Sequence, residues 1–173
     1  MSLNTIDNVH SEKSTARFLA TSQLKLNRLK SETIYSKRTK SELDLIYLED
    51  SVIVQVKEKN KPSESYYGFN LEVAKRIKSA WEWSAEDELI AIASTSEDSL
   101  FVMGCDLKTW EIPFKSLPCF NQVSQSERGN FEIDEDGSYL YWKNVDLHLD
   151  LEDFKAAVDP EFKAQLLAEK QEY

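Results

Sequence analysis

The chain contains few of the residues that mark disulfide-stabilised, fibrous or low-complexity proteins. It has two cysteines, four glycines and four prolines among 173 residues, and 41% of its residues are hydrophobic. Two cysteines, Cys105 and Cys119, are too few for a disulfide framework, and we interpret them as reduced thiols. A chain of this length and composition buries a core without help from disulfides or metal ions, so we expect one folded domain.

Long apolar runs are also missing. The longest one, Leu89 to Ala93, is far shorter than the roughly twenty residues that a membrane-spanning helix requires. The N-terminus lacks the charged and then apolar order of a secretory signal, and Asp7 and Glu12 are unusual in an organellar transit peptide. We therefore expect a cytoplasmic protein that does not contact a membrane.

The motifs of common catalytic and nucleotide-binding sites are absent as well. The sequence has no glycine-rich phosphate loop, no nucleophile elbow and no zinc-ligand spacing. Its two histidines, His10 and His148, show no signature that pairs either of them with a cysteine nucleophile. The sequence therefore favours a binding protein over an enzyme, and it predicts no cofactor and no resident metal ion.

Charge is present in abundance, but it is divided unevenly. Residues 1–40 carry eight basic and three acidic side chains, a net charge of +5, which leaves −15 for residues 41–173 of the total of −10. We interpret residues 1–40 as a basic, partly disordered N-terminal arm and residues 41–173 as a single acidic domain. An acidic surface attracts basic proteins and repels phosphates, so we expect a protein partner, with nucleic acid reached only through the arm. Two alternatives are that the charge serves solubility alone and that the arm lies back on the body.

The arm contains a stretch with helical spacing. Between Ala16 and Lys30, apolar residues recur at loosely helical intervals among basic ones, which predicts a short basic amphipathic helix. Such a helix would lie on the body or on a partner. Its candidate binding residues are Arg17, Lys25, Arg28 and Lys30.

Hydrophobic periodicity predicts an α+β fold with a mostly antiparallel sheet and two or three helices. Alternating segments predict strands, and Asn70, Asp150 and Asp159-Pro160 are typical helix starts. The predicted strands are 43–48, 52–56, 66–69, 89–93, 100–103 and 109–114, and the predicted helices are 71–81 and 151–169. We expect Trp81 and Trp83 to bury against the sheet, Pro113 to mark an edge strand or a strand end, and Phe162, Leu166 and Leu167 to dock the last helix.

The clearest local pattern lies between Asn130 and Trp142. Apolar Phe131 and Ile133 precede Asp136-Gly137, and Tyr139 and Tyr141 follow it with the same period of two, which predicts a β-hairpin. The carboxylates before Gly137 also suggest a calcium loop, but a lysine occupies the place of the final bidentate glutamate. The hairpin is the better interpretation.

The second half of the chain resembles a known family by the order of its elements. The matching elements are Leu100–Met103, Trp110-Glu111-Ile112-Pro113-Phe114, Leu117-Pro118, Ser126-Glu127-Arg128, Phe131-Glu132-Ile133, Asp136-Gly137, Tyr141-Trp142 and Asp146–Asp150. Over about residues 87–158 they resemble the bacterial domain-of-unknown-function family DUF2442. The resemblance implies a small α+β domain, and because some members are encoded beside short partner proteins, it implies an antitoxin-like role. The long N-terminal half and Asn144-Val145 depart from the family pattern.

One group of side chains suggests chemistry. Asp146, His148 and Asp150 alternate in an extended segment, so they can face one side, where a histidine between carboxylates can act as a base or a metal ligand. Asp150 has a competing role as a helix cap. Our main hypothesis is a non-enzymatic regulatory or antitoxin-like protein that engages a basic protein partner. The alternatives are a structural subunit of a larger assembly and a small metal-dependent hydrolase that uses these three residues.

Overall fold

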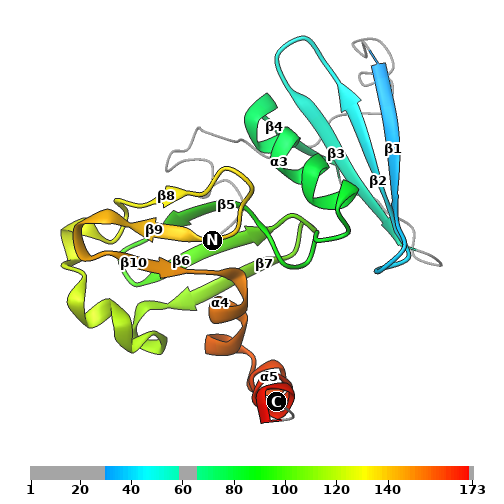
Figure 1. Cartoon of the computed structure of the whole chain (residues 1–173). Helices are drawn as coiled ribbons and strands as arrows, with labels where there is room; N and C mark the ends of the chain where they lie inside the picture. Colours follow the sequence, from blue (N-terminus) through cyan, green and yellow to red (C-terminus); the bar gives the residue numbers. More distant parts are fainter. Residues whose placement is uncertain (1–29, 59–65, 172–173) are drawn as a thin grey trace.

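A computed structural model describes residues 30–58 and 66–171 and has the predicted α+β architecture (Figure 1). Three antiparallel sheets are arranged in the strand orders β1-β2-β3-β4, β5-β6-β7 and β10-β9-β8. The first sheet consists of β1 (Lys30–Ser36), β2 (Ser41–Tyr47), β3 (Val52–Glu58) and β4 (Tyr67–Phe69), and it is followed by helix α3 (Leu71–Glu82).

The first sheet and α3 form because their apolar residues repeat with the period of each element. In β2 and β3, alternate side chains such as Leu45 and Val54 are fully buried against the helix, and in β3 the intervening Ile53 and Gln55 are buried as well. The Asn70 side chain accepts a hydrogen bond from the Val73 N–H at 2.9 Å and so caps the helix start. Ile77 and Trp81 then place the apolar face of α3 on the sheet.

The second sheet is buried on both faces and lies between the two halves of the core. It consists of β5 (Ile90–Thr95), β6 (Ser99–Gly104) and β7 (Thr109–Pro113). In β6, Phe101 and Met103 pack with α3 and the first sheet, whereas Leu100 and Val102 pack with the C-terminal elements. Because successive side chains of a strand point to opposite faces of the sheet, β6 contributes to two hydrophobic clusters. Pro113 ends β7, which is an edge strand as predicted.

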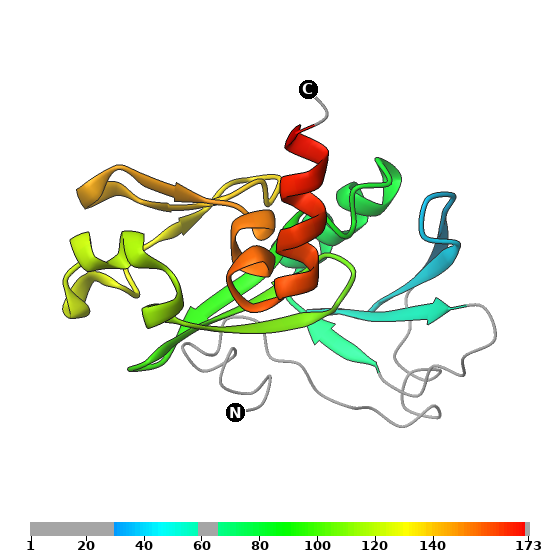
Figure 2. The same cartoon turned by 90° about the horizontal axis from the view of Figure 1, so that it is seen from below.

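The C-terminal elements cover the far face of this sheet. They are the 3₁₀ segments Phe114–Ser116, Pro118–Gln122, Gln125–Glu127 and Lys143–Val145, the strands β8 (Glu132–Ile133), β9 (Leu140–Trp142) and β10 (Leu147–Leu149), and the helices α4 (Leu151–Val158) and α5 (Pro160–Gln171). Trp142 is the centre of this cluster, because its ring contacts Phe120 edge-on with centroids 4.9 Å apart. Figure 2 shows β8–β10 and the 3₁₀ segments gathered at the end of the molecule away from the first sheet.

The folded part begins before residue 41, the predicted start of the acidic domain. Residues 30–36 form β1, which pairs with β2 over its full length, and the turn to β2 carries Arg38 to ion pairs with Asp87 and Glu88. Residues 1–29 of the predicted arm, including its amphipathic stretch up to Leu29, lie outside the described residues. Residues 30–40 are rich in basic side chains, and these hide the alternation of the strand, in which Ile34 and Ser36 point toward the core.

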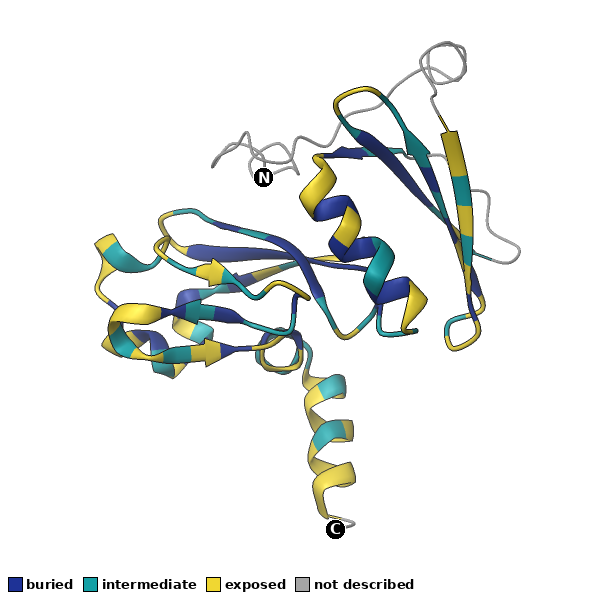
Figure 3. Cartoon of the chain, turned by 45° about the horizontal axis from the view of Figure 1, so that its top comes forward, coloured by how far each residue is buried: buried dark blue, intermediate teal, exposed yellow. Residues whose placement is uncertain are grey.

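Two predicted docking contacts are wrong. Trp81 is buried, but Trp83 is 81% exposed because it follows the last helical residue and points away from the sheet. The last helix does not dock through Leu167, which is 52% exposed, and none of the residues of α5 is buried. Figure 3 shows α5 projecting from the body with a mostly exposed surface. The other two residues of the predicted contact, Phe162 and Leu166, are one turn apart and half-buried, and Lys155 Nζ lies 5.8 Å from the Phe162 ring centroid, so α5 packs only loosely on the body.

The predicted hairpin is present, although its turn is longer than Asp136-Gly137. Glu132 pairs with Tyr141 and Ile133 with Leu140, while the Gly137 N–H donates to the Asp134 carbonyl at 2.9 Å. Among the residues of this turn, only Gly137 has a positive φ, +85°, so the turn ends in a left-handed glycine and does not use two such residues. As a consequence, Leu140 faces the core and Tyr141 faces outward.

Candidate functional site

Only one of the four predicted binding residues of the arm lies in the described part of the chain. Arg17, Lys25 and Arg28 precede it. Lys30 begins β1 and is exposed, and its Nζ lies 4.5 Å from the ring centroid of Tyr47 on the neighbouring strand. This is a cation–π contact at the sheet edge, which holds the lysine against its own protein.

The predicted residues of the C-terminal half lie on or beside the outer face of the β8–β9–β10 sheet. Glu132, Tyr141 and His148 are directly opposite one another on the three strands and form one row across the sheet. The intervening residues Leu140 and Leu149 are buried on the other face. Because successive side chains in a strand alternate between faces, the row points away from the core.

His148 lies on an aromatic platform. Its ring stacks on Tyr141 with centroids 4.2 Å apart and planes inclined by 22°, and it meets the edge of Tyr139 at 4.9 Å. The imidazole is nevertheless exposed. The arrangement holds a flat polar ring at the surface without covering it, since the tyrosines support it only from the side and below.

Carboxylates surround this platform and hold the tyrosine hydroxyl groups. The Tyr141 hydroxyl donates to Asp146 Oδ1 at 3.3 Å, and Asp146 occupies the left-handed region with φ 50°. A hydrogen bond to Asp134 raises the pKa of Tyr139, and burial, followed by the charge of Asp146, raises the pKa of Tyr141. Both tyrosines are therefore neutral hydrogen-bond donors across the physiological pH range.

The turn beside the platform carries a pair of acidic side chains. Their mutual hydrogen bond raises the pKa of Asp134 and lowers that of Asp136, whose carboxylate also accepts from the Ser138 N–H at 2.9 Å. Asp136 thus stays ionised well into the acidic range. We call the surface formed by these carboxylates and rings the acidic–aromatic face. It consists of Glu132, Asp134, Asp136, Tyr139, Tyr141, Asp146 and His148.

Asp150, the third member of the predicted triad, has another role. Its Oδ1 accepts from the Asp153 N–H at 2.8 Å, and Asp153 Oδ2 accepts from the Asp150 N–H at 2.9 Å, which is a reciprocal capping box at the start of α4. Among residues 30–58 and 66–171, no three His, Cys, Asp or Glu side chains are grouped so that they could hold a metal ion. The structure thus separates the predicted triad: Asp150 caps α4, whereas Asp146 and His148 lie at the outer face of the β8–β9–β10 sheet.

The elements on which the family resemblance depends serve the architecture. Glu127 Oε2 accepts from the side-chain amides of Asn130 and Asn144, each at 2.9 Å, and so joins two loops. The Trp142 indole donates to the Arg128 carbonyl at 2.9 Å, and the Arg128 guanidinium lies 4.7 Å from the ring centroid of Phe114. These contacts fix the loop beneath β9 and thereby position the acidic–aromatic face.

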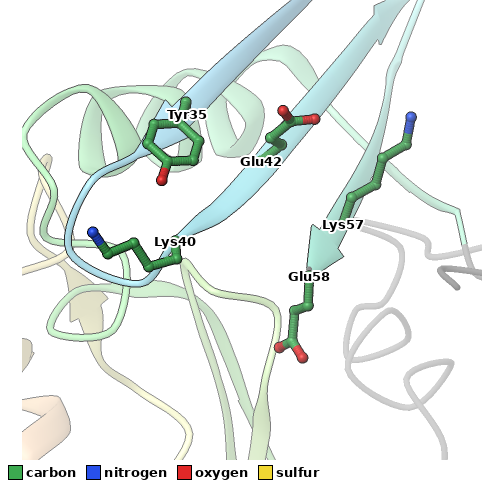
Figure 4. Close-up of a pocket in the computed structure, with 5 residues that line it drawn as sticks. All are labelled: Tyr35, Lys40, Glu42, Lys57 and Glu58. Atoms are coloured by element: carbon green, nitrogen blue, oxygen red, sulfur yellow. The ribbon is translucent and has the colours of Figure 1, made fainter. Parts of the chain in front are cut away.

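A second surface feature lies at the opposite end of the molecule. The face of the first sheet that points away from α3 has a depression of about 620 Å³, lined by Tyr35, Lys40, Glu42, Lys57 and Glu58 (Figure 4). Tyr35, Glu42 and Lys57 are opposite one another on β1, β2 and β3. The lining residues that the structure describes offer one aromatic ring and charges of both signs, which suits a peptide segment.

Sequence reasoning missed both the tyrosine platform and this depression. The signal for the platform was the strict alternation of Tyr139 and Tyr141 with Leu140 and Trp142, which places the tyrosines on the face opposite the more apolar pair. The depression depends on strand register, which no local pattern reveals.

In the part of the chain that the structure describes, none of the helices combines the length and apolar character needed to cross a membrane.

Comparison with known proteins does not assign the chain. No family model, no curated protein and no solved structure matches it. Its function is therefore inferred from the geometry and charge of these surfaces.

Proposed function

We propose that the protein is a non-enzymatic, regulatory or antitoxin-like binding protein whose acidic–aromatic face engages a basic segment of a partner protein. The observation that supports this proposal most directly is the row Glu132–Tyr141–His148, in which the exposed His148 ring stacks on the half-buried Tyr141 ring beside carboxylates. The resemblance to DUF2442 points in the same direction.

The chemistry of the face suits arginine better than other side chains. A guanidinium group is planar, stacks on aromatic rings and forms bidentate hydrogen bonds with carboxylates. Glu132 forms one end of the row, Asp146 accepts a hydrogen bond from the Tyr141 hydroxyl, and Asp136 adds a charge at the turn. An arginine inserted over His148 and Tyr141 would therefore meet both a π face and a carboxylate.

The same charges disfavour nucleic acid at this face. The carboxylates repel phosphate groups, and the net charge of −15 in residues 41–173 strengthens that repulsion over the whole body. For a basic protein segment, the field instead accelerates encounter at low ionic strength. The proposed complex should thus weaken steadily as salt is added.

A peptide titration tests the proposal with the full chain. We expect a fluorescent peptide of alternating arginine and glycine to bind at low salt, and His148→Ala and Asp146→Asn to weaken its binding about tenfold, since a stacked or charge-paired contact contributes roughly 1 kcal/mol or more. Glu169→Gln on α5 is the matched control, because it removes one exposed carboxylate far from the face. Equal losses for the control and the face variants would overturn the proposal.

A second proposal, a structural subunit of a larger assembly, is supported by α5. This helix has no buried residue and exposes Leu167, so it offers a free element for docking. If α5 serves assembly, Leu167→Lys should reduce the association measured by sedimentation and leave peptide binding unchanged. The chain is measured alone and with its binding partner. If it sediments as a monomer alone, and if the partner binds only through the acidic–aromatic face, the first proposal stands alone.

A further inference from the structure

A small pocket opens among the 3₁₀ segments, at the end of the molecule away from the first sheet (Figure 2). It lies between Pro118–Gln122 and Gln125–Glu127 on one side and Lys143–Val145 on the other, and its volume is about 160 Å³. Pockets for drug-sized ligands begin at roughly 300 Å³. This one therefore suits a single side chain or a fragment of similar size.

The depth of the pocket is apolar, whereas its mouth is polar. Val123 is 4% exposed and Trp142 is 1% exposed, so these two side chains lie deepest in the lining, with half-buried Val145 next. Asn130 and Asn144 line the same pocket but are exposed. A ligand that fits this lining places an apolar group inside and a polar group at the mouth.

Glu127 gives the mouth a carboxylate that is held in place. Its Oε2 accepts hydrogen bonds from Nδ2 of Asn130 and from Nδ2 of Asn144, each at 2.9 Å. In residues 30–58 and 66–171, no lysine or arginine side chain forms an ion pair with Glu127, and no side chain donates to its Oε1. Among these residues, only neutral donors therefore meet the negative charge of the carboxylate.

The two asparagines add further acceptors to the mouth. A carboxylate only accepts hydrogen bonds, so each amide turns its NH₂ group toward Glu127, and its carbonyl oxygen is left to accept. Neither Oδ1 atom accepts a hydrogen bond within the described parts of the chain. Glu127 Oε1 and the two amide oxygens thus call for a ligand with several N–H donors, and an ammonium group has three.

We propose that the pocket binds the N-terminal residue of a partner polypeptide. Its α-ammonium group lies at Glu127, and its side chain, an aliphatic group of about leucine size, lies against Val123 and Trp142. Capture of an N-terminal amine is a recurring mode of peptide recognition. In an N-terminal leucine, the charged group and the aliphatic group are attached to the same carbon atom, so one residue meets both requirements of the lining.

The same lining disfavours other cations. The side chain of a lysine or arginine from a partner carries its charge at the far end, so insertion would bring that charge to the apolar depth at Val123 and Trp142. A free amino acid carries a carboxylate beside its ammonium group, and none of the described lining residues is basic. A peptide N-terminus has a neutral amide at that place and avoids repulsion by Glu127.

The pocket is separate from the acidic–aromatic face. Trp142 is buried on the core side of β9, whereas its neighbour Tyr141 faces outward. Because successive side chains of a strand point to opposite faces, a ligand against Trp142 does not cover the row of Tyr141 and His148. The inference therefore goes beyond the proposed function and does not depend on it.

A titration of the full chain, followed by NMR, tests the site. The probe is Leu-Ala-Gly amide with a free N-terminus at about pH 6.5, below the pKa of about 8 of an α-amino group. We expect saturable shifts of the side-chain amides of Asn130 and Asn144 and of the Trp142 indole N–H, which donates to the Arg128 carbonyl at 2.9 Å. N-acetylated Leu-Ala-Gly amide, Gly-Ala-Gly amide and free leucine should each bind at least about tenfold more weakly, because they lack the charge, the side chain and the neutral C-terminal side, respectively.

Two variants separate binding from architecture. Glu127→Gln keeps an oxygen that accepts from both asparagine amides and removes only the charge, so it should weaken Leu-Ala-Gly amide about tenfold and leave the melting temperature nearly unchanged. Val145→Phe at a half-buried position fills the pocket and should abolish binding. Glu97→Gln, which removes an exposed carboxylate between β5 and β6, is the matched control and should bind like the unmodified chain.

The outcomes identify the occupant. Equal binding of the acetylated peptide, or full affinity in a Glu127→Gln variant that melts normally, would overturn the role of the carboxylate. Tighter binding of free leucine than of Leu-Ala-Gly amide would assign the pocket to a free amino acid and overturn the proposal. If Glu127→Gln does not fold, Val145→Phe decides, because retained affinity in that variant would place the peptide elsewhere.

Discussion

At the scale of single residues, Gly137 has two independent reasons to be glycine. Its φ of +85° is unfavourable for side chains, and a Cβ would lie 2.2 Å from the carbonyl oxygen of Ile90, which is backbone and does not move aside easily. The Ile90 N–H donates to the Gly137 carbonyl at 2.8 Å, so the turn is fastened to the start of β5.

We expect Gly137→Ala to lower the free energy of unfolding by about 3 kcal/mol and Gly137→Val by at least as much, through backbone strain and the displaced turn. Urea denaturation measures both. Gly129→Ala is the matched control, because its Cβ would meet only the Thr95 hydroxyl at 3.0 Å. Equal stability of the two alanine variants, or a calcium-dependent rise in melting temperature that Asp134→Asn abolishes, would favour the calcium-loop interpretation.

Tyr47 and Glu32 form a second residue-scale contact whose effect depends on pH. The Tyr47 hydroxyl donates to Glu32 Oε1 at 2.5 Å, and Lys78 Nζ lies 2.9 Å from the same oxygen. The bonds from Tyr47 and Lys78 hold the pKa of Glu32 below its usual value of 4.5, and burial, followed by the bond to Glu32, raises the pKa of Tyr47 to about 12.

Because the pKa of Glu32 is lowered in the folded state, its ionised form stabilises the fold above pH 4.5, and this contribution is lost as the pH falls through the lowered pKa. We expect Tyr47→Phe to cost about 1 kcal/mol at pH 7 and less at pH 3, as measured by urea denaturation. Tyr35→Phe, at an exposed tyrosine, should cost little at either pH. A cost of Tyr47→Phe that does not vary with pH would contradict the role of Glu32.

At the scale of elements, Arg76 connects helix α3 to two other parts of the fold. Its guanidinium is buried, with Nη1 donating to the Ala91 carbonyl of β5 at 2.5 Å and Nε donating to the Glu135 carbonyl of the β8–β9 turn at 3.3 Å. The Glu72 carboxylate is exposed, and its Oε1 lies 3.8 Å from Arg76 Nη2. The two backbone carbonyls therefore provide most of the stabilisation of the buried guanidinium charge.

We expect Arg76→Met to destabilise the protein by about 2–4 kcal/mol, because it leaves the buried Ala91 carbonyl and the partly buried Glu135 carbonyl without their donor. Lys75→Met on the exposed side of the same helix is the control and should change stability by less than about 0.5 kcal/mol. Thermal or urea unfolding distinguishes them. Similar losses for both variants would mean that helix propensity, and not the bridging guanidinium, determines the result.

At the scale of the whole molecule, the β5–β6–β7 sheet makes the two halves of the protein interdependent. Its strands contribute Phe101 and Met103 to one hydrophobic cluster and Leu100 and Val102 to the other. Neither the first sheet with α3 nor the C-terminal elements can bury their apolar side without this sheet. The two clusters should therefore unfold together.

Hydrogen exchange in increasing urea measures this cooperativity. We expect peptides from β2 and from α4 to lose protection at the same denaturant concentration, and Met103→Ala and Val102→Ala each to lower both midpoints. Buried truncations of this size cost about 1–4 kcal/mol. If Met103→Ala lowers only the midpoint of β2, the halves are independent domains and the shared sheet does not couple them.

The elements with strong local patterns were predictable from the sequence. Strands β2, β3 and β5 to β7, the Asn70 cap and the helix starts at Asp150 and Pro160 were predicted because each is determined by its own alternation or capping residue. The α+β class, the acidic body and the hairpin around Gly137 follow from the same local physics. Strand β1 was not predicted, since its weak alternation becomes a strand only through pairing with β2.

Contacts between distant residues were decided by the tertiary structure alone. The stack of His148 on Tyr141, the separation of Asp150 from that face as a helix cap, and the exposure of Trp83 depend on register and packing. A shift of one residue in register reverses the face of every side chain in a strand, and nothing local fixes it. Composition and periodicity thus determined the charge of the chain and which of its side chains are apolar enough to form a core. Strand pairing, in contrast, decided which polar and aromatic side chains meet at the surface.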